Sequence, residues 1–354
     1  MRPKIALVAP GPEILGGHSV QARALAAALR GDGYDVAVVR IDPRFPRGLG
    51  WLRRRRYLRT VLNQALYVPS LLTLRRADVV HIFSASYWSF LLAPVPAMLA
   101  ARGLGKRVVL NYHSGEAEDH LGRWGRLVHP WLRLANEIVV PSEYLKDVFA
   151  RHGYRARVVP NVVDTGRFRY RERMPLRPRL LSTRNLEPYY RVDNTLHAFA
   201  LLKARYPDAT LTVAGFGSEE ARLRRLAASL ATAGISFVGR VDPGAMPDLC
   251  AAADVFVNSS VVDNQPLSVL EAFAAGLPVV STATGGIAAL VRDGVTGLTV
   301  PAGDPPAMAK AVTTLLEDPE AARRMARRAR REVEAHAWSH VRERWAAVYA
   351  GAAA

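Results

Sequence analysis

The stretch Asp263–Gly286, DNQPLSVLEAFAAGLPVVSTATGG, combines a polar loop, a short apolar helix pattern, a glycine and a strand pattern. Asp263 and Asn264 are residue types that cap helix starts, and Pro266 suits a first turn because its missing N–H needs no partner there. Gly276 predicts the helix end, and the apolar run that follows predicts a buried strand. The stretch therefore predicts one helix-to-strand step of an α/β domain.

A second acid, Glu271, lies eight positions after Asp263. Along a continuous helix, a rise of about 1.5 Å per residue would separate the two carboxylates by about 12 Å. That distance exceeds the roughly 5 to 9.5 Å between the paired carboxylates of a glycosidase. It suits a long ligand with a polar ring at each end and an anion over the helix start. A nucleotide sugar, with its hexose, diphosphate and ribose, has this layout.

The segment resembles the acid-x(7)-Glu signature of the family 4 (group 1) retaining glycosyltransferases, which have the two-domain B-type fold. The resemblance implies that Asp263 faces the transferred sugar, that Leu267 and Ser268 offer backbone amides to the diphosphate, and that Glu271 holds the ribose. The chain departs from the family pattern because Asp replaces the usual first Glu and Asn264–Pro266 replaces the usual Phe-Gly. An ordinary capped helix in an α/β domain is the alternative interpretation.

Short Val- and Ile-rich runs alternate with helical patterns along the whole chain. Such continuous apolar strands are typical of parallel sheets covered on both faces. We expect two doubly wound, Rossmann-like domains that face each other across a cleft. The runs are 5–9, 36–40, 79–83, 108–112, 138–142 and 158–161 in the first half, and 179–183, 211–215, 235–239, 255–259, 279–283 and 297–301 in the second.

The expected domains are an acceptor-side domain over 1–165 and a donor-binding domain over 179–334. The polar, Arg-rich stretch 164–178 has no hydrophobic period and is the expected linker. An amphipathic pattern ends the chain, and the family resemblance implies that a helix over 335–354 crosses back to the first domain.

Composition fits a folded protein of about two domains, since the chain has 354 residues, of which 50% are hydrophobic and 22% charged. The single cysteine, Cys250, excludes an internal disulfide and favours a reducing compartment. We see neither a signal region at the start nor an apolar run long enough to span a membrane. We expect a soluble, cytoplasmic protein.

The formal net charge of +17 predicts attraction to an anionic surface. No zinc-finger spacing or aromatic RNA-binding motif accompanies it, which argues against nucleic acid. The segment 51–74 has the pattern of a basic amphipathic helix, so the inner face of the membrane is a candidate partner. An ordinary helix packed on the sheet is the alternative. The pattern places Leu58, Val61, Leu62, Ala65 and Leu66 on one face and Arg53, Arg56, Thr60 and Asn63 on the other.

Two features of the first half predict an acceptor-side site. Gly16 and Gly17 precede a helix, where the absence of side chains lets a ligand approach the backbone. His113 follows a strand end. The charged loop after it, at 116–120, is a second candidate for contact with the acceptor. The resemblance implies that the glycines meet the distal phosphate and the acceptor, and that His113 lies near the transferred sugar. A plain turn, a structural histidine and a solvated loop are the alternatives.

Further donor-site residues are implied in the second half. Arg184 stands where the family has the arginine that clamps the diphosphate, and a planar guanidinium can grip two phosphate oxygens. The lysine that the family has six residues later is Tyr190 here, so Arg191 is the candidate replacement. Gly239 and Arg240 are the residues expected beside the base, although packing alone also explains their segment.

Missing motifs exclude several other enzymes. The sequence has no Asp-x-Asp metal motif, zinc-ligand spacing, Walker loop or Gly-x-Ser-x-Gly elbow. We therefore expect no metal or other cofactor, with His113, Asp263 and Arg184 as the catalytic residues. The predicted function is transfer of a hexose-type sugar from a nucleotide diphosphate to a hydroxyl, on a glycolipid or polysaccharide precursor. A nucleotide-sugar epimerase or hydrolase and a catalytically silent membrane-associated binding protein stay open as alternatives.

Overall fold

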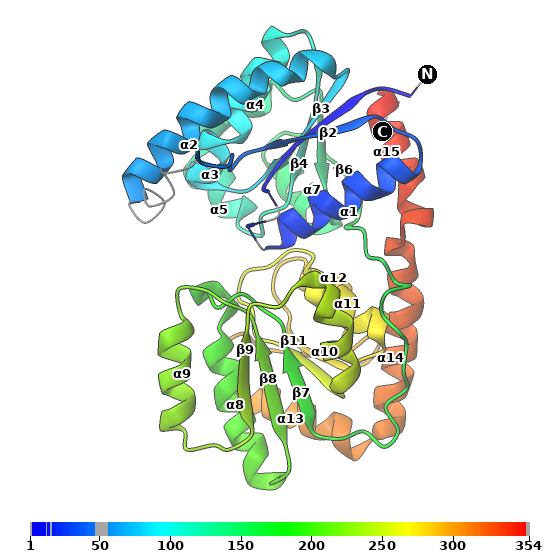
Figure 1. The fold of residues 1–354 in the computed structure, drawn as a ribbon. Coiled ribbons are helices and arrows are strands. Elements are labelled where there is room, and N and C mark those ends of the chain that lie inside the picture. The colour runs from blue at the N-terminus through cyan, green and yellow to red at the C-terminus, as the bar shows by residue number, and fades with distance from the viewer. Residues whose placement is uncertain (1, 12, 15, 47–55, 352–354) are drawn as a thin grey trace. The chain divides into compact units, whose positions relative to one another are not determined.

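The computed structural model describes residues 2–11, 13–14, 16–46 and 56–351 (Figure 1). The chain divides into two compact units. Unit 1 contains residues 1–162 together with 341–354, and unit 2 contains residues 163–340.

Unit 1 is built on a parallel six-stranded sheet in the order β2-β1-β3-β4-β5-β6. Strand β1 lies between β2 and β3, and its Ile5 pairs with Val36 of β2 on one side and with Val79 of β3 on the other. Helices cover the sheet (Figure 1), so its central strands β1, β3 and β4 are buried along almost their whole length. The strands are β1 (Ile5–Ala9), β2 (Val36–Arg40), β3 (Val79–Ser84), β4 (Arg107–Tyr112), β5 (Glu137–Val140) and β6 (Arg157–Val158). The helices are α1 (Gly17–Gly31), α2 (Arg56–Ser70), the 3-10 helix η2 (Leu71–Arg76), α3 (Tyr87–Leu92), α4 (Pro94–Gly103), α5 (Ala117–Arg123), α6 (Gly125–Leu132) and α7 (Glu143–Arg151).

Unit 2 contains a second parallel six-stranded sheet in the order β12-β11-β10-β7-β8-β9. The strand order reverses between β7 and β10, which is where ligands of doubly wound sheets bind. The strands are β7 (Arg179–Ser182), β8 (Thr210–Ala214), β9 (Ile235–Gly239), β10 (Val255–Asn258), β11 (Val279–Thr282) and β12 (Leu298–Val300). The helices are α8 (Val192–Arg205), α9 (Glu220–Ser229), α10 (Met246–Ala252), α11 (Leu267–Ala275), α12 (Ile287–Leu290), α13 (Pro305–Glu317) and α14 (Pro319–Val333), with short 3-10 turns η3 (Pro188–Tyr190), η4 (Pro243–Ala245) and η5 (Glu334–His336).

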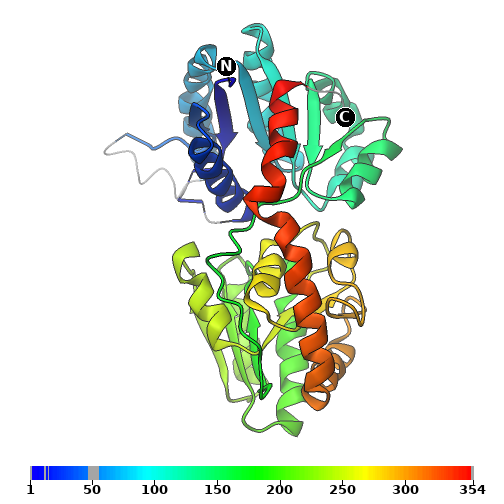
Figure 2. The ribbon, with the colours of Figure 1, turned by 90° about the vertical axis from the view of Figure 1, so that its right-hand side faces the viewer.

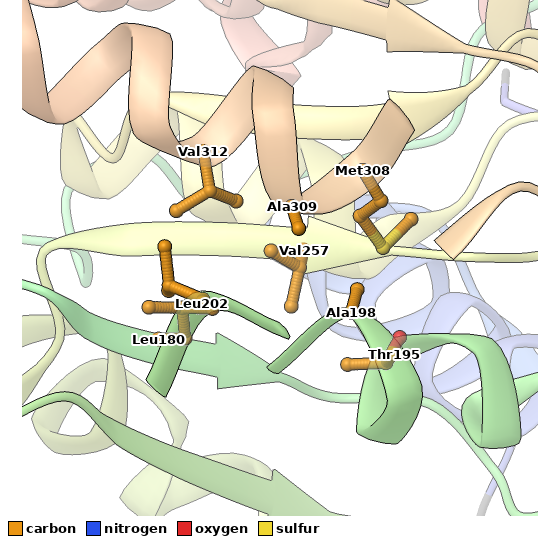
Figure 3. A pocket seen from close by; sticks show the side chains of 8 residues that line it. All are labelled: Leu180, Thr195, Ala198, Leu202, Val257, Met308, Ala309 and Val312. Carbon is orange, nitrogen blue, oxygen red and sulfur yellow. The ribbon is translucent and has the colours of Figure 1, made fainter. Parts of the chain in front are cut away.

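The apolar seam between α8, α13 and the strands beneath them contains a small pocket (Figure 3). Its one polar lining side chain, Thr195, bonds Ser259 Oγ at 2.9 Å. The pocket is therefore a packing gap inside the core and offers a nucleotide no charged group. Its lining residues are Leu180, Thr195, Ala198, Leu202, Val257, Met308, Ala309 and Val312.

The predicted fold class is confirmed, and each of the twelve apolar runs forms a strand. Both units show parallel sheets with flanking helices, as the unbroken apolar character of the runs predicts. The observed ends differ from the expected ones by a few residues; β6, for example, ends at Val158.

The stretch 164–178, which we expected to link the domains, lies in unit 2. Phe168 is buried in the core of that unit. Arg173 is only 4% exposed, and its guanidinium donates to the carbonyl of Cys250 at 2.9 Å and to that of Ala275. Two of the arginines that suggested a solvated linker, Arg171 and Arg173, instead bond the backbone at the ends of α10 and α11.

The apolar face of α2 is partly exposed, which does not fit the alternative of an ordinary helix packed on the sheet through that face. Leu58 (51% exposed) and Val61 (68%) lie on the open side, whereas Asn63, expected on the polar face, donates to the carbonyl of Ile41 at 2.8 Å. The sequence pattern located the apolar stripe but left open which side of the helix packs on the domain. Residues 51–55, including Arg53, lie outside the described part of the chain, as does the side chain of Arg56.

The last helix, α15, runs over Trp338–Ala350, and its residues from Val341 onward belong to unit 1 (Figure 2). Trp345 and Tyr349 are buried there, and the Tyr349 hydroxyl lies 2.9 Å from His81 Nδ1. Within the described ranges, no helix is both long and apolar enough to cross a membrane.

Candidate functional site

The start of α11 is open for an anion. Pro266 occupies the N-cap position, and within the part of the chain that the structure describes no side chain caps this helix. The expected capping by Asp263 or Asn264 is therefore wrong: Asp263 Oδ1 instead accepts from the Asn264 amide at 2.9 Å. The chain between the acid and Leu267 is not helical, so helical rise does not set the distance to Glu271. An uncapped helix start presents N–H groups and a positive dipole end.

Arg184, Asp263 and Ser268 meet beside this helix start. Arg184 follows β7 and Asp263 follows β10, and these two strands are neighbours at the point where the strand order reverses. The guanidinium forms an ion pair with Asp263 through Nη2 and donates to Ser268 Oγ through Nη1 at 3.0 Å. Arg184 is 9% exposed, and its Nε has no hydrogen-bond partner among the described residues. Burial raises the pKa of Asp263, and the nearby Arg184 opposes that shift.

The two residues near the missing family lysine behave differently. The Tyr190 ring lies under the guanidinium of Arg184, with Cζ 4.0 Å from the ring centroid, a cation–π contact. Arg191 donates from Nε to Asp193 at 3.0 Å and from Nη2 to Asn194 at 3.2 Å. The Arg191 guanidinium is therefore already hydrogen-bonded at the start of α8. It would have to break these bonds to contact a phosphate.

Glu271 is half-buried on α11, one helical turn after Leu267. Burial raises its pKa to about 7, and Arg167 opposes the shift. Arg167 donates to the carbonyl of Pro243 at 2.7 Å. A carboxyl with a pKa near neutrality can become a charged acceptor when hydroxyl donors reach it.

The glycines of unit 2 have separate roles. A Cβ at Gly215 would lie 2.0 Å from the Arg184 carbonyl, so this glycine allows the β7 loop to approach β8. At Gly239 a Cβ would meet nothing, although its φ of +69° favours glycine. The exposed Arg240 that follows lies over the Phe216 ring at 5.8 Å. The edge formed by the ends of β8 and β9 thus carries one aromatic ring and one cation.

In unit 1, the glycine pair lies at the start of α1. Gly16 is the N-cap residue, and a Cβ at Gly16 or at Gly17 would meet nothing within 4 Å. The φ of Gly16, 176°, is ordinary extended backbone. Packing against the described residues therefore does not explain the glycine pair.

His113 is part of a histidine pair that the sequence analysis missed. Its ring lies 5.3 Å from that of His18 and stacks on Phe83 at 5.4 Å. Burial first, and then His18 and His81, lower the pKa of His113 well below its usual value, and burial lowers the pKa of His18 to about 4. His113 Nε2 is buried and has no hydrogen-bond partner among the described residues. The position of His18, directly after the glycine pair, was the available sequence signal.

Metal ligands do not gather in the part of the chain that the structure describes, since it contains no group of three or more His, Cys, Asp and Glu side chains suited to an ion.

Two family models match the chain. "Glycosyltransferase Family 4" matches residues 15–167, and "Glycosyl transferases group 1" matches residues 171–332. Together these matches cover most of both units.

Two curated relatives are each 31% identical in sequence to this chain. A glycogen synthase of Mycobacterium tuberculosis is 31% identical over 298 residues, which is 78% of this chain and 69% of the relative. A GDP-mannose-dependent alpha-(1-6)-phosphatidylinositol monomannoside mannosyltransferase of Mycolicibacterium smegmatis is 31% identical over 264 residues, 67% of this chain and 69% of the relative.

Solved structures share the fold. Anabaena HepE in complex with UDP-glucose has a TM-score of 0.77 at 17% identity and covers 99% of this chain and 100% of its own. Sucrose-phosphate synthase from Thermosynechococcus elongatus has a TM-score of 0.77 at 21% identity, with 99% of each chain covered.

Proposed function

Because this chain belongs to the group 1 glycosyltransferases, enzymes that act on nucleotide sugars, we propose that it transfers a hexose from a nucleotide diphosphate to a hydroxyl with retained configuration and without a divalent metal. The acceptor class that we propose is a glycolipid or polysaccharide precursor. The observation that carries the proposal is the cluster of Arg184, Asp263 and Ser268 beside the uncapped start of α11.

The cluster fits a departing diphosphate. Arg184 is buried and has an unused Nε donor, and the amides of Leu267 and Ser268 lie at the adjoining helix start. Fixed donors of this kind stabilise developing negative charge, and losing one such donor typically lowers kcat by about 10²- to 10³-fold. A bound diphosphate would compete with Asp263 for the guanidinium and release the carboxylate toward the sugar. This arrangement supplies the positive charge that a metal supplies in other transferases.

Glu271 is the proposed ribose ligand, because its half-buried carboxyl follows the same helix start by one turn. Gly239 and Arg240 are the proposed neighbours of the base, with Phe216 as a stacking surface. Arg191 is the weaker phosphate candidate, since its guanidinium is already bonded to Asp193 and Asn194.

In unit 1 we assign the acceptor and the distal phosphate to the end of the sheet that carries Gly16, Gly17 and His113. The open space above the glycine pair supports this assignment, as does the unpartnered Nε2 of His113. The neutral imidazole can accept the proton of a hydroxyl or donate to a sugar oxygen, depending on its tautomer.

The membrane remains a proposed surface for this chain. Spacings of three and four residues place Leu58, Val61, Ala65, Val68 and Leu72 on one exposed stripe of α2 and η2. Arg59, Arg75 and Arg76 are exposed beside the stripe. An apolar stripe flanked by cations can lie in the headgroup region of an anionic bilayer, with about 1 kcal/mol from each cation near the surface.

Sedimentation with vesicles tests this surface. We expect the protein to bind vesicles containing phosphatidylglycerol, to release them at high salt, and to lose binding in V61E/L72E. Leu201→Glu, at an exposed leucine of unit 2, is the matched control. Equal binding by both variants would contradict the membrane assignment.

Thermal-shift screening in EDTA tests the donor assignment. We expect one of the UDP-, GDP- or ADP-hexoses to raise the Tm without metal and Glu271→Ala to abolish that shift. Proton NMR of the transfer product then reports the anomeric configuration, which we expect to match that of the donor. A requirement for Mg²⁺ or Mn²⁺, an inverted product, or donor turnover without transfer would contradict the proposal.

A further inference from the structure

An exposed aromatic cluster in unit 1 has no role in the site described so far. Trp88 on α3 is 65% exposed, and Trp124 lies half-buried between α5 and α6. Their ring centroids are 5.4 Å apart and their planes meet at 89°, and Tyr87 lies 5.4 Å from Trp124. Two indoles that meet in this way form a corner with open ring surface.

The cluster lies at the end of the sheet where ligands bind. The helix α3 begins three residues after β3, and Trp124 follows α5, which comes after β4. These strands are parallel neighbours, so both loops leave from the same edge as His113, the first residue after β4. The cluster and the proposed acceptor-side histidine therefore share one loop region.

The cluster is held in place by bonds beneath it. Tyr87 has a φ of +56°, which is unusual for a residue with a side chain, and its hydroxyl donates to Asp119 Oδ2 at 2.6 Å. Asp119 also pairs with Arg123 Nε at 2.8 Å. The buried His120 contacts the rings of Tyr87 and Trp124. Backbone strain that neighbouring bonds maintain is characteristic of functional sites.

A carboxyl accompanies the rings. Glu116 is half-buried at the start of α5, and burial first, then Asp119, raise its pKa. Glu116 is the N-cap residue of α5, three positions before Asp119, whose carboxylate anchors Tyr87. Hydrogen-bond acceptors beside an exposed aromatic surface suit a ligand that has both apolar C–H groups and hydroxyls.

We propose that Trp88, Trp124 and Glu116 form a subsite for a sugar ring of the acceptor, so that the acceptor is a glycan or carries one. This inference rests on the proposed transferase function and names the chemistry of its acceptor. One face of a hexose consists of C–H groups that pack on an indole, and the hydroxyls at its rim donate to carboxylates. A lipid acyl chain fits less well, because burying the carboxylate in hydrocarbon without a donor is costly.

Saturation-transfer NMR on the full chain tests the subsite with maltohexaose, mannohexaose, cellohexaose and chitohexaose as probes. We expect at least one to receive saturation at its ring C–H protons. Trp88→Ala should reduce the transfer at least five-fold, and Trp88→Phe should restore most of it. Trp124→Ala is the second variant, while Leu201→Ala, an exposed leucine of unit 2, is the matched control and should behave like the parent.

Two companion measurements separate the outcomes. If no hexaose binds, or if Trp88→Ala binds as the parent does, the subsite is wrong. Loss of vesicle binding in Trp88→Ala with glycan signals unchanged would assign the cluster to the membrane instead. The donor-induced thermal shift is read in parallel, so a parent that binds donor but no glycan refutes the subsite alone. A parent that binds no donor refutes the proposed function.

Discussion

The two units carry opposite kinds of side chain at their proposed sites. In unit 2 the proposed donor cluster is ionic: Arg184 and Asp263 form a nearly buried pair beside a helix start. In unit 1 the corresponding end of the sheet carries neutral rings, with His18 and His113 held uncharged by burial. A diphosphate needs fixed positive charge, whereas an acceptor hydroxyl needs an orienting surface and a proton acceptor. The contrast predicts that the two sides respond differently to mutation and to pH.

Removing the cation should have the largest effect. We expect Arg184→Ala to lower kcat by about 10²- to 10³-fold, because the departing diphosphate loses a fixed donor. It also leaves Asp263 buried and unpaired, which can destabilise the protein by about 3–5 kcal/mol. The double variant R184M/D263L removes the unpaired charge and should regain stability without regaining activity. Recovery of sugar transfer by the double variant would contradict the proposal that Arg184 stabilises the departing diphosphate in unit 2.

Glu271 should give the next effect. The neutral Glu271→Gln removes a charged acceptor of the ribose hydroxyls, which should weaken donor binding by about 10- to 150-fold, or roughly 1.5–3 kcal/mol. The folded-state pKa of about 7 lies above the unfolded value, so the carboxyl favours folding at low pH and loses that contribution as pH rises through 7. We therefore expect Glu271→Gln to have a higher Tm than the parent at pH 8 and a similar one at pH 5. Isothermal titration and thermal scans at the two pH values check both parts.

Unit 1 should respond to acid in the reverse direction. Burial lowers the pKa of His81 to about 3 and that of His120 to about 4. Histidines kept neutral in the fold favour it above their unfolded pKa near 6.5, and this contribution is lost as pH falls toward 4. Trp338 belongs to unit 2 and every other tryptophan to unit 1, so tryptophan fluorescence mainly reports unit 1. We expect an acid transition between pH 6.5 and 4 that moves a few tenths of a pH unit lower in His120→Gln. A transition that does not move would contradict the electrostatic contrast.

The smallest expected effect concerns Tyr190. Its ring contacts the Arg184 guanidinium, and such a contact is worth about 0.5–2 kcal/mol. Tyr190→Ala should weaken donor binding by a few fold, and Tyr190→Phe should leave it unchanged. Tyr190→Lys tests whether a second cation strengthens the donor side. Equal donor affinity in the Ala and Phe variants would show that the ring does not position Arg184.

The sequence predicted features that depend on local pattern. Continuous apolar runs became strands, and Gly276 ended α11 with a φ of +73° in the left-handed region. The family resemblance implied that Arg184 and Asp263 both belong to the donor site, but it did not predict their direct ion pair. Features that depend on tertiary contacts were harder: the α2 stripe faced outward, and Arg191 bonded Asp193. His18 was missed because its partner, His113, lies 95 positions away in the chain; only its place directly after the glycine pair marks it in the sequence.

The burial of Trp345 and Tyr349 against His81 has a consequence for biosynthesis. Most of unit 1 precedes unit 2 in the chain, yet a part of its core comes from Val341, Trp345, Val348 and Tyr349 of α15, which follow unit 2. A nascent chain that has released only the first half therefore exposes the surface that α15 later covers. Domains that fold during synthesis normally do so from the amino terminus onward. Here unit 1 cannot complete its core until α15, which follows unit 2 in the chain, has been synthesised.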